Sequence, residues 1–85
     1  MNLTFTPSAW EDYQWFLQHD RKLLKRVNQL IKDVIRSPLE GIGKPEALKG
    51  NLSGYWSRRI NDEHRLVYAV RDDAVIVIAC RFHYE

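Results

Sequence analysis

The chain closes on side chains that can bind anions and move protons. Its last residues, "ACRFHYE", follow the apolar run "AVIVI" and include Arg81 and His83. Two further arginines, Arg59 and Arg65, lie upstream in runs that alternate like strands. Arginine forks bind phosphate oxygens and stabilise charge that develops on phosphorus, and histidine exchanges protons near neutral pH. These residue types suit a phosphodiester substrate.

Metal-free cleavage of RNA needs a base for the ribose 2′-OH, an acid for the 5′-oxygen and cations around the phosphate. His83 is a candidate acid or base, and the central loop offers Glu40 and Glu46 as carboxylates. Glu46 lies in "GKPEALKG", close to Lys49. A lone histidine is more often an ordinary hydrogen-bonding residue. The residues alone therefore leave both an RNA-cleaving enzyme and a nucleic-acid-binding module open.

The sequence argues against metal and disulfide chemistry. The three histidines, at positions 19, 64 and 83, show no metal-ligand spacing. The single cysteine, Cys80, cannot form an internal disulfide or a zinc cluster. We expect no cofactor and no metal.

Two helices are predicted in the N-terminal half. After a short strand over "NLTF", the segment "TPSAWEDYQWFLQ" begins with a capping residue, Thr6, and with Pro7 at the first helical position. A second helix begins near Asp20, and its apolar residues follow the i, i+3, i+4, i+7 rule over "LLKRVNQLIKDVI".

The C-terminal half predicts a sheet. After a loop over 37–54 with two prolines and four glycines, three strand-like runs cover 55–60, 64–70 and 74–84. The short breaks between them predict an antiparallel meander. We expect one α+β domain over residues 1–85, with two helices packed on an antiparallel β-sheet.

Alternation assigns the faces of these strands, because residues two apart share a face. The even positions form a predicted core face that consists of Trp56, Ile60, Leu66, Tyr68, Val70, Ile76, Ile78, Cys80 and Phe82, with Arg58 as the misfit. The odd positions place Arg59, Arg65, Arg81 and His83 together on the other face.

Positive charge is concentrated in the second helix. The net charge is only +2, but residues 21–36 carry six Lys or Arg against one Asp. Such a cluster is typical of a polyanion-binding surface, although a solvated helix face has the same composition.

The sequence also bounds the location. No apolar stretch reaches the roughly 18 residues that span a bilayer, and the N-terminal residues lack a signal-peptide pattern. We expect a cytoplasmic protein with no membrane partner.

The segment "GKPEALKGNLSGYWSRRINDEHRLVYAV", followed by "ACRFHY", resembles the YoeB family, within the RelE/ParE superfamily of bacterial toxin–antitoxin systems. The resemblance covers essentially the whole chain, including "LIKDVIRSPLEGIGKPE". The sequence departs from the family pattern at Glu85, which extends the usual end, and at Phe82, where a tyrosine is common.

The resemblance implies a RelE-like microbial RNase fold and a ribosome-dependent mRNA interferase that cuts message in the ribosomal A site through the 2′-OH. By motif, Glu46 corresponds to the general base and His83 to the general acid. The resemblance also implies roles at the phosphate or in substrate orientation for Arg59, Arg65, Tyr84 and, as a further contact, Lys49.

The resemblance implies partners as well: a YefM-type antitoxin, the ribosomal RNA of the A site, the mRNA substrate and a second copy in a homodimer. The strongest alternative is a ParE-like toxin, which shares the fold but binds and inhibits DNA gyrase without cutting RNA. A pure binder has no need of an acid–base pair such as Glu46 and His83.

Overall fold

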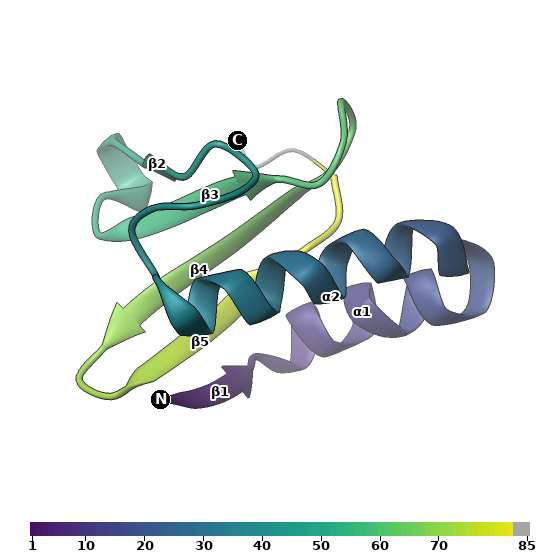
Figure 1. Ribbon diagram of the computed structural model, residues 1–85, viewed down its shortest axis with the longest axis horizontal. Coiled ribbons are helices and arrows are strands. Elements are labelled where there is room, and N and C mark those ends of the chain that lie inside the picture. The colour runs from purple at the N-terminus through teal and green to yellow at the C-terminus, as the bar shows by residue number, and fades with distance from the viewer. Residues whose placement is uncertain (83–85) are drawn as a thin grey trace.

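A computed structural model describes residues 1–82 of the chain and shows two helices packed on one face of a five-stranded sheet (Figure 1). The elements are β1 (Asn2–Phe5), α1 (Pro7–His19), α2 (Arg21–Arg36), β2 (Glu46–Ala47), a 3₁₀ turn (Gly50–Leu52), β3 (Tyr55–Arg59), β4 (Arg65–Arg71) and β5 (Ala74–Ala79). The predicted α+β class, with its two N-terminal helices, is confirmed. The sheet, of order β1-β5-β4-β3-β2, is mixed because β1 pairs with β5 in parallel.

Both helices begin where the capping residues predict. The Thr6 hydroxyl accepts a 3.1 Å hydrogen bond from the N–H of Ala9, and the Asp20 carboxylate accepts one of 3.1 Å from the N–H of Leu23. Asp20 also ends α1, because its own N–H donates to the carbonyl of Phe16. One residue thus joins the two helices and turns them into a hairpin.

The core lies between the helix pair and the sheet. Its buried members are Ala9 and Phe16 of α1, Val27, Leu30, Ile31 and Val34 of α2, and Ile60, Leu66, Tyr68, Val75, Val77 and Cys80 of the sheet region. No helix between residues 1 and 82 is long and apolar enough to cross a membrane.

The predicted faces hold for β3 and β4 but were wrong for most of β5. Val75 and Val77 are buried in the core, whereas Ile76 and Ile78 are only partly buried and lie outside the core cluster. The cause is the turn between the strands: Arg71 pairs with Ala74, so odd residues of β5 lie opposite even residues of β4. Farther along, Tyr68 pairs with Val77 while Val67 pairs with Ala79, and this bulge returns the even residue Cys80 to the core.

The last predicted strand was too long. β5 ends at Ala79, and Phe82 has a positive φ of 63° that no extended strand allows. Its side chain is 48% exposed, so its predicted place in the core was also wrong.

The central loop contains a short edge strand that alternation did not reveal. Glu46 and Ala47 form β2, which pairs antiparallel with β3. Just before β2, the carbonyl of Gly43 accepts a 2.7 Å hydrogen bond from the N–H of Arg59. The loop is therefore fastened along β3, and its carboxylate belongs to the sheet.

Candidate functional site

The strand register brings three of the predicted site residues together on the face of the sheet opposite the helices. Glu46 pairs directly with Ser57, and residues paired in this way point to the same side. Arg59, two residues beyond Ser57, shares that side and pairs directly with Arg65 of β4. Glu46 and Arg59 are thus diagonal neighbours, with Arg65 next in the row.

The three side chains differ in exposure and in hydrogen bonding. Glu46 and Arg59 are exposed. Arg65 is half-buried, and its Nη1 donates to the carbonyls of Asn61 and His64 in the β3–β4 turn. Its guanidinium is therefore held at one end of the site, while the neighbouring arginine is free to move to a ligand.

Arg58 holds the loop that carries Glu46. Its side chain is completely buried, as the even face of β3 requires. The guanidinium donates to the carboxylate of Asp33 in α2 and to three backbone carbonyls of the loop, those of Ser37, Glu40 and Ile42. Its Nε donates to the hydroxyl of Tyr68 at 3.2 Å. The residue that misfits the core pattern is thus a structural node behind the site.

Glu40, the other candidate carboxylate, is exposed in this loop. Its main-chain carbonyl accepts a hydrogen bond from the guanidinium of Arg58. Lys49 is exposed and precedes the 3₁₀ turn. Neither Glu40 nor Lys49 takes part in the strand pairing that groups Glu46 with Arg59 and Arg65.

The prediction that Arg81 shares the arginine face was wrong. Its guanidinium carbon lies 3.9 Å from the ring centre of Trp15 in α1 and 4.5 Å from that of Phe82. Its Nε is buried and has no hydrogen-bond partner among the described residues. Arg81 follows the bulge and the end of β5, so strand parity no longer fixes its side, and it packs toward the helices.

The described chain ends beside Arg65. The carbonyl of Phe82 accepts a 3.1 Å hydrogen bond from the N–H of Arg65, and the N–H of Phe82 donates a 2.7 Å bond to Nδ1 of His64. His83 and Tyr84 lie outside the described residues. Residue 82 is nonetheless fixed at the end of β4 where the arginine row lies.

His64 is a buried histidine that lies outside the set of predicted site residues. Its side chain lies among the rings of Phe16, Trp15 and Phe82, with centre distances of 5.2, 6.3 and 5.5 Å. Burial lowers the pKa of this imidazole. Its even position in the strand pattern, on the same face as Leu66, was the available signal.

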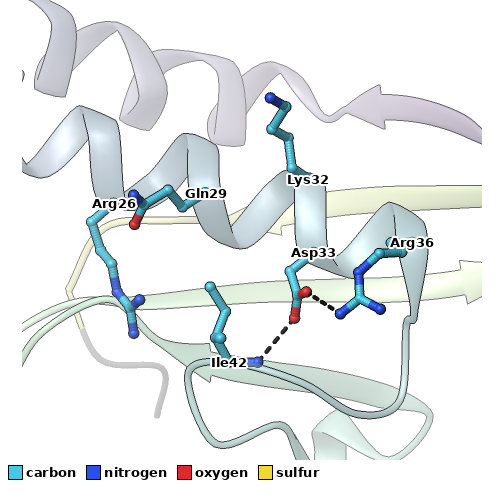
Figure 2. A pocket seen from close by; sticks show the side chains of 6 residues that line it. All are labelled: Arg26, Gln29, Lys32, Asp33, Arg36 and Ile42. Carbon is cyan, nitrogen blue, oxygen red and sulfur yellow. Dashed lines mark hydrogen bonds and ion pairs between the residues drawn. The ribbon is translucent and has the colours of Figure 1, made fainter.

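A shallow basic hollow runs along the exposed side of α2 (Figure 2). Arg26, Lys32 and Arg36 line it, with Ile42 of the loop at its edge. Asp33 lies among them, hydrogen-bonded to Arg36 at 2.6 Å and to the N–H of Ile42 at 2.9 Å. The carboxylate neutralises part of the positive charge of the hollow.

Among residues 1–82, no group of three or more His, Cys, Asp or Glu side chains is placed to hold a metal ion. The arrangement provides instead a carboxylate and two guanidinium groups on one sheet face. Such a set can bind a phosphate and accept a proton from a nearby hydroxyl.

Residues 5–84 match the model of the YoeB-like toxin of bacterial type II toxin–antitoxin systems. The chain belongs to this family. Toxin YoeB of Synechocystis sp. is 62% identical over 85 residues, a match that covers 100% of this chain and 99% of that protein.

Solved structures of the family superpose closely. A YoeB/ParE toxin from Agrobacterium tumefaciens gives a TM-score of 0.96 at 48% identity and covers 99% of this chain and 100% of that one. The YoeB dimer from Staphylococcus aureus gives 0.91 at 55% identity. The toxin in the heterotetrameric YoeB–YefM complex from the same organism gives 0.90 at 55% identity, and both matches cover 99% of this chain and 98% of the other.

Proposed function

We propose that this member of the YoeB-like toxin family is a ribosome-dependent mRNA interferase that cleaves message in the ribosomal A site without a metal. The observation that carries the proposal is the shared face of Glu46, Arg59 and Arg65, with the described chain ending beside Arg65. The proposed base Glu46 and the two proposed phosphate ligands thus lie on one face of the sheet, and the described chain ends next to them at Phe82.

The direct pairing of Arg59 with Arg65 supports the proposal that the site binds an anion. Like charges directly opposite one another across two strands destabilise a sheet. Arg59 and Arg65 are such a pair, and the described hydrogen bonds supply no carboxylate to either guanidinium. A bound phosphate would relieve the repulsion and use both forks.

In the proposed reaction, Glu46 takes the proton of the ribose 2′-OH, whose oxygen attacks the adjacent phosphorus. The bond from phosphorus to the 5′-oxygen breaks, and His83 protonates that leaving oxygen. The products are a 2′,3′-cyclic phosphate and a 5′-hydroxyl end. Arg59 and Arg65 stabilise the charge on the phosphoryl oxygens.

Two further residues have proposed roles in substrate binding. Tyr84 orients substrate, and Lys49 is an additional phosphate contact. Both proposals rest on the family motif.

The partners follow from the same proposal. The basic hollow on α2 would contact ribosomal RNA by neutralising phosphates. By similarity to the S. aureus assemblies, a YefM-type antitoxin would bind and neutralise the chain, and two copies would form a homodimer. Because the proposed activity requires ribosomes and mRNA, we propose that the protein acts in the cytoplasm.

The test maps message ends by primer extension in a reconstituted translation reaction, with and without ribosomes. We expect cuts within A-site codons only when ribosomes are present. Glu46→Gln should lower the rate by about 10²-fold or more, because it keeps the shape of the side chain but removes the base. Intact message together with loss of gyrase activity in a parallel assay would contradict the proposal and favour the ParE-like alternative.

A further inference from the structure

The segment that leads to His83 is fastened to the body of the protein at three successive residues. The N–H of Cys80 donates to the carboxylate of Asp12 at 3.1 Å. The guanidinium of Arg81 stacks over Trp15 at 3.9 Å. The N–H of Phe82 then donates to Nδ1 of His64 at 2.7 Å. Helix α1 supplies two of these contacts, and His64, the residue before β4, supplies the last.

The contact at His64 is made by a side chain that can change its protonation state. Nδ1 must carry a lone pair to accept the Phe82 N–H, so a neutral ring holds its proton on Nε2. Nε2 lies 3.4 Å from a carboxylate oxygen of Glu63. A protonated ring would carry hydrogen on both nitrogens. Nδ1 could then no longer accept the hydrogen bond from the Phe82 N–H, because both groups would be donors.

The surroundings of His64 oppose protonation on balance. The residue is 3% exposed, and its ring packs edge-on against Phe16. Of the charged groups around it, Arg81 opposes an imidazolium, whereas Glu63, Asp12 and Asp20 favour one. Burial dominates these contributions, and the pKa of His64 therefore lies below its ordinary value of 6.5.

We propose that His64 is a positioning residue for the reaction: its neutral imidazole anchors the amide of Phe82 and so fixes where the chain enters His83. The inference rests on the proposed role of His83 as general acid. The second bond at Phe82, from the N–H of Arg65 to its carbonyl, couples the same anchor to a phosphate-binding residue of the site. His64 thus holds Phe82, the residue before the proposed acid, beside the arginine row.

The anchor itself can be tested without any activity. In ¹⁵N-labelled wild-type protein, NMR should show His64 as the Nε2–H tautomer at neutral pH. The Phe82 amide should have a downfield proton shift and slow exchange with solvent. Both signals should change together as the pH falls through the lowered pKa of His64. A Nδ1–H tautomer, or a Phe82 amide that exchanges as fast as an unstructured peptide, would overturn the proposal.

The positioning role is tested with two variants. His64→Asn retains an acceptor near the place of Nδ1 but cannot titrate, whereas His64→Leu fills the space without an acceptor. The readout is the single-turnover cleavage rate on ribosomes saturated with toxin, and ribosome affinity and circular dichroism report on docking and folding. We expect His64→Leu to lower the rate about tenfold or more with little change in ribosome affinity, because small misplacements of a catalytic group are costly.

His64→Asn should cleave within about threefold of wild type at pH 7.5, because Asn supplies an acceptor like the one that the anchor needs. As the pH falls below 6.5, the wild-type rate should drop further than that of His64→Asn. A folded His64→Leu variant that cuts at the wild-type rate would overturn the positioning role. Absence of cleavage by wild-type protein would instead overturn the proposed function, and the NMR measurement would still decide whether the anchor exists.

Discussion

The guanidinium of Arg58, on β3, donates a 2.5 Å hydrogen bond to the carboxylate of Asp33, on α2. This ion pair joins the sheet to the helix layer at the base of the loop that carries Glu46. The exposed fraction of the Arg58 side chain is zero, whereas Arg59, the next residue, is exposed on the opposite face. Two adjacent arginines thus have different tasks, one structural and one proposed to bind phosphate.

The adjacent arginines should separate stability from activity. Arg58→Met removes the buried partner of Asp33 and the guanidinium donor of three backbone carbonyls. We expect it to lower the free energy of unfolding by about 3–5 kcal/mol. Arg59→Met should change it by no more than about 0.5 kcal/mol, yet lower message cleavage on the order of 10²-fold. Urea denaturation and the primer-extension assay measure the two effects. Equal losses of stability in the two variants would contradict this division.

Gly41 should tolerate no side chain. Its φ is 128°, and an added Cβ would lie 2.0 Å from a carboxylate oxygen of Asp33 and 3.1 Å from Nη1 of Arg58. Gly50 is the matched control, because its φ is also positive, at 65°, but nothing lies within 4 Å of an added Cβ. We expect Gly41→Ala to lower the unfolding free energy by about 1–3 kcal/mol more than Gly50→Ala. A larger loss at Gly50, measured by thermal unfolding, would refute the steric explanation.

The ion pair between Asp33 and Arg58 should make the free energy of unfolding depend on pH in the acid range. Hydrogen bonds from Arg36, the N–H of Ile42 and Arg58 hold the pKa of Asp33 well below its ordinary value of 3.8. Because the folded-state pKa is the lower one, this stabilisation is fully present above pH 3.8 and is lost as the pH falls below it. The stability gap between wild type and Asp33→Asn in urea titrations should therefore be constant from pH 7 to 5 and shrink below pH 4. A constant gap down to pH 2.5 would show that Asp33 is not coupled in this way.

Cys80 should be almost unreactive in the folded protein. Burial, with the carboxylate of Asp12 as a second cause, raises the pKa of its thiol to about 12. Since only the thiolate attacks, we expect a thiol reagent at pH 8 to react on the order of 10²–10³-fold more slowly with native protein than with protein unfolded in guanidinium. Rapid stoichiometric labelling of native protein would mean that the strand end opens easily.

Much of the fold could be read from local patterns. The start of each helix was predictable because Thr6 and Asp20 satisfy backbone donors within three residues of themselves. The core faces of β3 and β4 were predictable because most of the large apolar residues, Arg58 apart, fall at even positions, whereas Arg59 and Arg65 fall at odd ones. The apolar run of β5 has no such pattern, and its register is fixed by pairing with β4 across the turn, so Ile76 and Ile78 were assigned to the wrong face.

The sequence by itself determined the helices, the α+β class and the residue types for phosphate chemistry, because capping, periodicity and side-chain chemistry are local properties. The tertiary structure alone decided which of those residues meet. Strand pairing placed Glu46 beside Arg59, helix packing drew Arg81 to Trp15, and the return of the chain to β4 brought Phe82 to His64. These contacts join residues far apart in the chain, and their geometry depends on sheet register and on the space left between layers, which no local pattern contains.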